Sequence, residues 1–176
     1  MKRVASHSGR HWQVFWCLAV VLAVSACNYR FGGYREGRAG VATMSIPPFE
    51  NRTRQIGIET LFTNELVYEV GRGDRIALAA PGRADAVVHG VIKDLKTNTI
   101  SRQNLNVSLE RRVYVTVELT AKNRQGEAFW SYQLTEDEVY FVEPDKVSTE
   151  ANLRVALAEI SRRIAEKFHY RFTQAF

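Results

Sequence analysis

The sequence has 176 residues, of which 24 are Lys or Arg and 19 are Asp or Glu, and its formal net charge is +5. Three of the basic residues (Lys2, Arg3 and Arg10) and none of the acidic residues lie before residue 27, so residues 27–176 carry a formal charge of only +2. This weak charge gives no support for a nucleic-acid partner, and the length suits one domain rather than several.

The first feature in chain order is an apolar run, Val14–Val24, which follows the basic N-terminus and contains no charged residue. A helix over these residues rises about 16 Å, about half the thickness of a bilayer core, so the run is too short to cross a membrane. A basic start, a short apolar middle and small residues at the end are typical of a secretory signal. We therefore expect residues 1–26 to be a signal peptide.

The apolar run leads into Cys27, which is preceded by the small residues Ser25 and Ala26. This stretch resembles the lipobox of bacterial lipoproteins, in which the cysteine is lipidated and becomes the new N-terminus. The resemblance implies that Cys27 is lipidated, that Cys17 is lost with the signal, and that no disulfide forms. In the sorting rule of these lipoproteins, Asn28 in place of aspartate implies an outer-membrane location, with the chain anchored on the periplasmic side.

The segment after Cys27, residues 27–40, contains four glycines and is predicted to be a flexible tether to a folded domain at residues 41–176. The domain begins with a predicted short strand, Val41–Ile46, which the two following prolines end because proline cannot donate to a strand ladder. A loop follows, in which Asn51 or Thr53 is expected to cap a helix.

The first helix is predicted over Ile58–Val70, because apolar residues recur there at helical spacing and the glycines at 71 and 73 end the pattern. A short strand is predicted next, at Arg75–Ala79, and Pro81–Gly82 then turns the chain. These two elements supply one amphipathic surface and one short strand to the fold.

Three long strands are predicted after this turn, over Ala84–Ile100, over Val107–Ala121 and from Ala128 onward. The second of these strands alternates apolar and polar side chains, which is typical of a sheet with one buried face. A hairpin turn is predicted at Asn123–Gly126. The alternation changes phase after Leu134, which predicts a bulge or a strand end near Glu136.

A final amphipathic helix is predicted to begin near Ser148 or Thr149, with an apolar stripe that includes Leu157, Ile160 and Ile164. Two amphipathic helices and a half-buried sheet can cover each other in two layers. The predicted fold class is therefore α+β, a two-layer sandwich with two helices packed on one face of a mainly antiparallel four-stranded sheet.

The sequence offers no constellation of residues for catalysis. His89 and His169 are isolated, and Gly71–Gly73 lacks the remainder of a phosphate-binding loop. The acidic stretch Glu136–Glu138 is interpreted as a solvated strand end rather than a calcium site. We expect no catalytic residue, no metal and no cofactor, and a hydrolase carried on a lipid anchor would need a catalytic group that the sequence does not offer.

Four basic residues form a candidate binding site for phosphate groups. Arg111 occupies the otherwise apolar face of its strand, while Arg112 faces the opposite side. Lys93 and Lys96 are expected in a loop close to Arg111, so these three form the main surface and Arg112 is its weaker member. Guanidinium and ammonium groups bind phosphate well. The alternative interpretation is a solvated sheet edge whose charges discourage strand aggregation.

Several segments together resemble the lipopolysaccharide-assembly lipoproteins, the LptE family. They are the lipobox, Tyr29–Phe31, Ile46–Thr53, Glu59 and Asn64–Leu66. The order of one strand, a helix, long strands and a second helix also fits this family. The resemblance implies two helices on a four-stranded sheet and a protein that plugs an outer-membrane β-barrel and helps it assemble.

The same resemblance implies three partners: the barrel, lipopolysaccharide, and the membrane through the N-terminal lipid. In this family the complex places lipopolysaccharide in the outer leaflet, and the phosphates of that lipid are the ligand expected for the four basic residues. Activators of peptidoglycan synthases and curli-secretion lipoproteins remain alternatives, since they share a strand followed by a turn like Pro48–Asn51. Those proteins interleave helices and strands, whereas Ala84–Val142 shows no helical period, which favours the plug.

Overall fold

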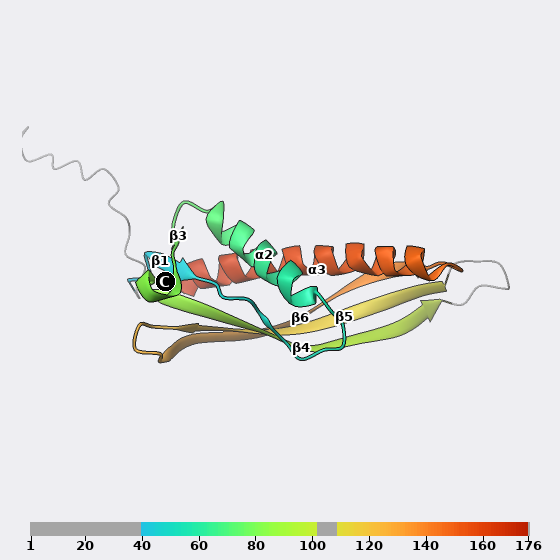
Figure 1. The fold of residues 1–176 in the computed structure, drawn as a ribbon, viewed down its shortest axis with the longest axis horizontal. Coiled ribbons are helices and arrows are strands. Elements are labelled where there is room, and N and C mark those ends of the chain that lie inside the picture. The colour runs from blue at the N-terminus through green and yellow to red at the C-terminus, as the bar shows by residue number, and fades with distance from the viewer. Residues whose placement is uncertain (1–39, 102–108, 176) are drawn as a thin grey trace, which may run out of the picture. The chain divides into compact units, whose positions relative to one another are not determined.

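The structure, a computed structural model, describes residues 40–101 and 109–175 (Figure 1). Its long elements are α2 (Ile58–Gly71), β4 (Ala86–Ser101), β5 (Leu109–Lys122), β6 (Ala128–Val142) and α3 (Lys146–Ala175). Its short elements are β1 (Thr43–Ser45), β2 (Glu50–Asn51), β3 (Ala77–Leu78) and the 3-10 turn η1 (Pro81–Arg83). The predicted signal peptide, Cys27 and residues 28–39 of the predicted tether lie outside the described residues.

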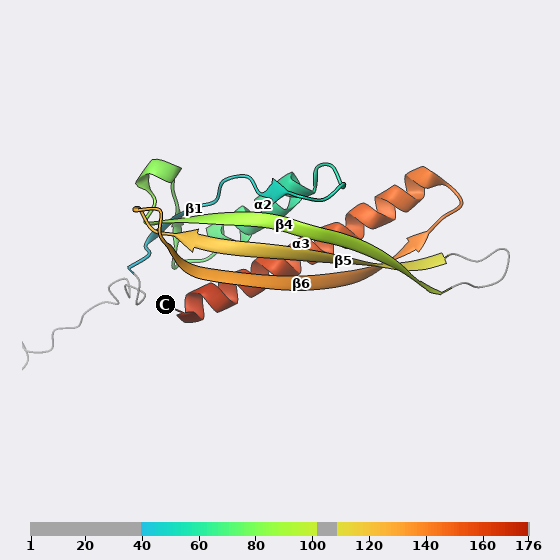
Figure 2. The same ribbon diagram turned by 90° about the horizontal axis from the view of Figure 1, so that it is seen from below.

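The described elements form two layers, with α2 and α3 on one face of the sheet and no described helix on the other face (Figures 1 and 2). The predicted α+β fold with both helices on one face is confirmed. The predicted four-stranded, mainly antiparallel sheet is wrong, because the described sheet is mixed and has six strands in the order β3-β1-β4-β5-β6, with β2 also paired to β4. The three short strands make only parallel pairs. The strands predicted at Val41–Ile46 and Arg75–Ala79 are confirmed as β1 and β3, whereas β2 and the parallel direction of the pairs were not predicted.

The middle one of the three long strands is β5, which pairs antiparallel with both β4 and β6. Val113, Val115, Val117 and Leu119 are fully buried beneath the helices, and the residues between them are half-buried. The alternation predicted for this strand is therefore confirmed over residues 112–121. Burial of these side chains on one face is the main reason for the register of the sheet, since a slip by one residue would expose all of them.

A bulge in β4 lies between Ile92 and Asp94 and changes which side chains face the helices. Before the bulge, the buried residues Val88 and Ile92 face the helices. After it, Leu95 lies opposite the buried Val115 and so takes the helix-facing position. One extra residue in a strand shifts the alternation by one, which a strict period of two in the sequence does not anticipate.

The last strand, β6, keeps one uniform register with β5 through its acidic part, so the predicted bulge or strand end near Glu136 is wrong. Leu134 and Tyr140 are both buried, and the alternation between them directs Glu136 and Glu138 to the helix-facing side. The pattern is misleading because carboxylates occupy two positions that a sheet core usually gives to apolar side chains.

The first helix, α2, begins after Gly57, whose φ of 83° lies in the left-handed region, and no side chain caps it. The predicted helix is confirmed, but the predicted caps are wrong. Asn51 instead fixes the loop before the helix, because its Oδ1 accepts a hydrogen bond from the N–H of Thr53 at 2.9 Å. Its Nδ2 donates to the carbonyl of Gln55 at 2.8 Å and to the carboxylate of Glu59 at 2.9 Å.

The second helix, α3, begins at Lys146, earlier than predicted, and Asp145 is its cap. The carboxylate of Asp145 accepts hydrogen bonds from the N–H of Ser148 at 2.8 Å and from its hydroxyl at 2.9 Å. The predicted apolar stripe is confirmed, since its members are buried: Leu153, Leu157, Ile160, Ile164, Phe168 and Phe172. Near the C-terminal end of the helix, the ring of Trp130 lies 5.4 Å from Phe168 and from Phe172, edge-on to both, and this contact joins α3 to β6.

Gly90 of β4 lies against the ring of Phe49, and a Cβ added there would lie 2.4 Å from two of the ring carbons. Phe49 is buried and its N–H donates to the hydroxyl of Thr63 at 2.9 Å, which limits how far it can move. We expect Gly90→Ala to lower the free energy of unfolding by about 1–3 kcal/mol, measured by urea denaturation. Gly82→Ala is the matched control, because its added Cβ meets no atom within 4 Å. Equal stability of the two variants would contradict this packing.

Candidate functional site

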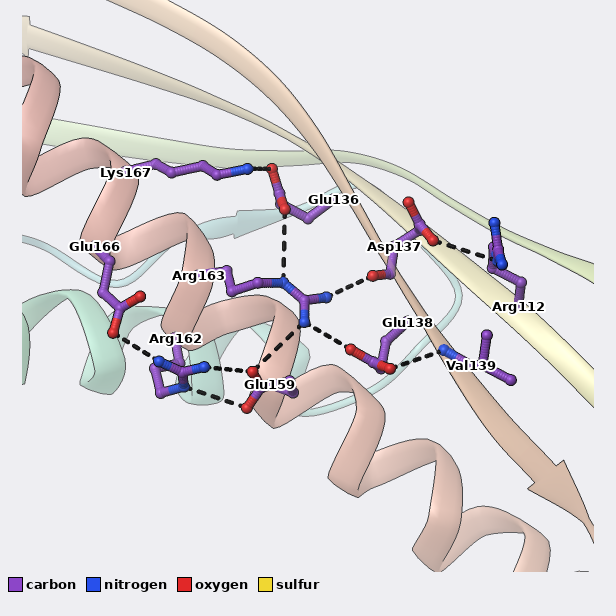
Figure 3. Close-up of polar contacts among 10 residues, drawn as sticks. All are labelled: Arg112, Glu136, Asp137, Glu138, Val139, Glu159, Arg162, Arg163, Glu166 and Lys167. Carbon is purple, nitrogen blue, oxygen red and sulfur yellow. Dashed lines mark hydrogen bonds and ion pairs between the residues drawn. The ribbon is translucent and has the colours of Figure 1, made fainter.

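A network of charges joins β6 to α3 (Figure 3). Glu136 and Glu138 face the helix, and the guanidinium of Arg163 lies between them. Its Nη1 donates to the carboxylate of Glu138 at 2.6 Å, and its Nε lies 3.6 Å from the carboxylate of Glu136. Lys167, one helical turn later, also pairs with Glu136. Two cations of α3 therefore neutralise two carboxylates that the strand alternation directs toward the core.

The same arginine also binds the main chain of the strand, because its Nη2 donates to the carbonyl of Asp137. The side chain of Glu136 is only 13% exposed and that of Arg163 is 26% exposed, so these pairs are partly shielded from water. The hydrogen bond from Arg163 holds the pKa of Glu138 below its ordinary value. The network fixes helix on sheet, and its carboxylates are occupied by cations rather than free for catalysis.

This network corrects the interpretation of Glu136–Glu138 as a solvated strand end. Asp137 does face the outer surface, but its two neighbours are paired with the helix. The signal that could have found the network is the spacing: Arg163 and Lys167 lie on one face of α3, and the two glutamates lie on one face of β6. In the part of the chain that the structure describes, no group of three or more His, Cys, Asp or Glu side chains is placed to hold a metal ion.

Three of the four predicted phosphate-binding residues, Lys93, Lys96 and Arg112, lie on the outer face of the sheet, opposite the helices. Each has an acidic partner on that face, with nitrogen to oxygen distances of 2.7 Å for Lys93–Glu118, 2.5 Å for Lys96–Asp94 and 3.4 Å for Arg112–Asp137. Hydroxyl pairs lie among these charges, such as Thr116 with Thr135 at 2.9 Å. The outer face is therefore polar, with its charges largely compensated.

Arg111 lies on the other side of the sheet, where its register partners are Thr99 of β4 and the buried Tyr140 of β6. Its side chain is half-buried, and it makes no hydrogen bond or ion pair with any described residue. The prediction that Arg111 and Arg112 face opposite sides is confirmed. The predicted grouping of Arg111 with Lys93 and Lys96 is wrong, because both lysines belong to β4 and face outward. Phosphate binding by any of the four stays a prediction.

Asp85, which the sequence pattern did not indicate, joins three segments at one end of the sheet. Its Oδ2 accepts hydrogen bonds from the hydroxyl of Thr43 at 2.7 Å and from the N–H of Thr43 at 2.9 Å. Its Oδ1 lies 2.7 Å from the guanidinium of Arg124, in the turn between β5 and β6. The hydrogen bond from the Thr43 hydroxyl is the main reason why the pKa of Asp85 lies below its ordinary value.

A lowered pKa makes the contribution of Asp85 to stability dependent on pH. The contribution is fully present above the pKa of the unfolded chain, about 3.9, and it is lost as the pH falls through the pKa of the folded chain. We expect the stability difference between the wild type and Asp85→Asn to shrink between about pH 6 and about pH 3. Urea denaturation at several pH values measures this difference. Asp74→Asn, at an exposed position, is the control, and an equal pH trend in both variants would contradict the role of Asp85.

Within the described residues, no helix is both long enough and apolar enough to cross a membrane. Solved structures with a similar fold include a hypothetical protein from Chlamydia trachomatis, with 12% identity, a TM-score of 0.50, and coverage of 76% of this chain and 96% of that one. A protein from Xanthomonas campestris has 10% identity and a TM-score of 0.50, with coverage of 71% and 81%. At these identities the likeness supports the fold alone.

The rare lipoprotein B from Shewanella oneidensis is also similar, with 14% identity, a TM-score of 0.49, and coverage of 75% of this chain and 94% of that one. No curated protein matches the chain in sequence. The family model described as LptE, lipopolysaccharide-assembly, matches residues 41–172, which extend from the residues just before β1 to the last turns of α3. The resemblance found in the sequence motifs is thereby confirmed. The chain belongs to the LptE family of lipopolysaccharide-assembly proteins.

Proposed function

We propose that this chain is an outer-membrane lipoprotein that plugs a β-barrel translocon for lipopolysaccharide, helps the barrel to assemble, and assists insertion of the lipid into the outer leaflet. The observation that carries the proposal is the family match over residues 41–172. The succession of β4, β5 and β6, with no helix between them among the described residues, also supports it, because the alternative lipoprotein classes interleave helices with strands. Membership of an assembly family agrees with the expectation that the chain is not an enzyme.

The lipid anchor is proposed from the lipobox at Val24–Cys27. In this proposal residues 1–26 are removed, Cys27 carries the lipid, and residues 27–40 tether the domain at residues 41–176 to the membrane. Mass spectrometry of the N-terminal peptide of the mature protein tests it, and an acylated Cys27 is the expected result. An unmodified Cys27 or a start at another residue contradicts the proposal, and Cys27→Ser should leave unprocessed precursor in the inner membrane.

The barrel partner is supported by the character of the outer sheet face. This face carries compensated ion pairs such as Lys93–Glu118 and hydroxyl pairs such as Thr116–Thr135, which suit the polar interior of an outer-membrane barrel. Affinity purification of the tagged chain from detergent-solubilised native membranes tests the partnership. We expect a heat-modifiable β-barrel protein to co-purify in an equal amount, and the absence of any barrel would contradict the plug.

The contact with lipopolysaccharide phosphates is proposed at Arg111 first. Its guanidinium has no acidic partner among the described residues, whereas Lys93, Lys96 and Arg112 would have to leave theirs. We expect Arg111→Ala to weaken lipopolysaccharide binding by the purified chain more than Arg112→Ala does, at matched stability, and added salt to weaken the wild type. Unchanged binding in both variants would remove these arginines from the site without affecting the barrel proposal.

A further inference from the structure

The strand β6 lies at one edge of the sheet, so one side of its main chain has no neighbouring strand in the described structure. Along an antiparallel edge strand, every second residue directs its N–H and C=O groups toward the neighbouring strand, and the residues between them direct these groups away from it. From Trp130 to Val142 the register with β5 is uniform, so this alternation is unbroken. Whether a residue number is odd or even therefore tells whether the N–H and C=O of that residue point away from β5.

The second half of this outward edge is already occupied. Asn152 of α3 donates to the carbonyl of Phe141 at 3.0 Å, and Arg163 donates to the carbonyl of Asp137. The N–H of Val139 donates to the carboxylate of Glu138 at 3.1 Å. These three odd-numbered residues identify the outward set, and a side chain of the fold hydrogen-bonds to one main-chain group of each.

The part of the same edge from Ser131 to Thr135 is open. Ser131, Gln133 and Thr135 belong to the outward set by parity, they are exposed, and no described residue outside the sheet hydrogen-bonds to their main chain. Edge strands are usually protected by charged residues, proline or bulges. The stretch Trp130–Thr135 contains no charged residue, proline or glycine, and its register with β5 is regular, since the register shift of this pair lies before it, at Phe129. The charges of this strand all lie in the half that is already covered.

A groove of about 820 Å³ runs beside the open edge, between β6 and the C-terminal part of α3. Its lining combines Tyr132 and Leu134 of the strand with Lys167, Tyr170 and Arg171 of the helix. Lys167 is paired with Glu136. Arg171 stacks its guanidinium over the ring of Tyr132 at 4.3 Å, and it has no carboxylate partner in the described part of the chain. One uncompensated positive charge therefore lies beside free main-chain groups.

We propose that the open edge of β6, at Ser131, Gln133 and Thr135, accepts an extended segment of a protein partner as an added strand. Each of the three residues offers one N–H and one C=O, and an acidic side chain of the segment would pair with Arg171. The inference rests on the proposed function, because we take the partner to be the barrel protein. The segment is a loop or a terminus of that protein, since strands within a closed barrel wall are already paired on both sides.

Hydrogen–deuterium exchange on the full chain reads this pairing directly. The chain is compared alone in detergent and in the complex purified from native membranes, with residue-resolved mass spectrometry of peptides covering residues 128–142. We expect the amides of Ser131, Gln133 and Thr135 to exchange at least about tenfold more slowly in the complex. The amide of Val139, which already donates to Glu138, is the internal control and should change little.

Two pairs of variants test the same contact, and the measurement is the amount of barrel protein that co-purifies with each variant. Gln133→Pro removes the outward N–H, and proline is tolerated on an edge strand where that N–H faces solvent, whereas Gln133→Ala retains it. Arg171→Glu reverses the charge on an exposed helical position, whereas Arg171→Lys preserves it. We expect several-fold less barrel to co-purify with Gln133→Pro than with Gln133→Ala, and with Arg171→Glu than with Arg171→Lys. The melting temperature of each of the four variants is measured as well, to check that the variant is folded.

Each outcome decides a different point. Unchanged exchange at the three amides, with the barrel still co-purifying, overturns the added strand and leaves the proposed function intact. No barrel with the wild-type chain overturns both. If the purified chain is dimeric by light scattering and Gln133→Pro makes it monomeric, the occupant is a second copy of this chain and the choice of partner is overturned.

Discussion

Replacing Ile160 by alanine is expected to lower the free energy of unfolding by about 2–5 kcal/mol. Ile160 is fully buried in the stripe of α3 that faces the sheet, and Leu157, one turn earlier, is only 2% exposed. Truncation of either side chain removes apolar contacts and leaves a cavity that the packed layers cannot fill completely. Because small domains are stable by only about 5–15 kcal/mol, each variant should lose a large part of the total.

Val155→Ala is the matched control for these two variants. Val155 lies on the same helix but is 71% exposed, so its truncation should change stability by no more than about 0.5 kcal/mol. Urea denaturation of the purified chain and its melting temperature measure all three. If Leu157→Ala and Ile160→Ala have the same melting temperature as the wild type, the apolar stripe of α3 is not the core face of the helix.

Arg163→Ala is expected to lower the free energy of unfolding by about 2–3 kcal/mol, the second largest effect after the core substitutions. The substitution leaves Glu138 without its cation and Glu136 with Lys167 alone, on the side of β6 that faces α3. The carbonyl of Asp137 loses its donor at the same time. Removing one member of a partly buried pair costs more than the pair contributes, because the remaining charge is left poorly solvated.

The neighbouring Arg162 supplies the control, since Arg162→Ala removes the same chemical group from the next position. Arg162 pairs with Glu159 and Glu166 along the exposed side of α3, within one helix (Figure 3). Exposed ion pairs within one helix are screened by water and contribute little, so the loss should be well below that of Arg163→Ala. Equal losses in denaturant titrations of the two variants would show that the network does not fix the helix on the sheet.

Long periodic elements were predictable from the sequence because their periods are set by burial. The alternation of β5 and the apolar stripe of α3 each extend over enough residues to show a clear period, and both are confirmed. The short strands β2 and β3 have two residues each, so they show no period. The longer elements determine which short strands come to lie side by side. For this reason the parallel part of the sheet was not predicted.

The errors within the long strands have two different physical origins. In β6, Glu136 and Glu138 occupy helix-facing positions, and their partners lie on α3, at a distance in sequence that no local pattern reveals. In β4, the bulge after Ile92 places Lys93 and Lys96 on the same face although their numbers differ in parity. Both errors concern charged residues whose location depends on tertiary structure, so the candidate site was less predictable than the core.

The parallel pairing of the N-terminal strand bears on the order in which the domain folds. Thr43 pairs with Ala77 and Met44 with Ala86, whereas β5 and β6 are joined by a short turn. Closing a long loop is slower than closing a hairpin, so we expect β1 to be protected after β5 and β6 in pulse-labelled hydrogen exchange during refolding. Protection of Met44 at the same rate as the hairpin would contradict this order. In the proposed anchored form, the strand nearest to Cys27 would then become ordered after the hairpin, which lies farther from the anchor along the chain.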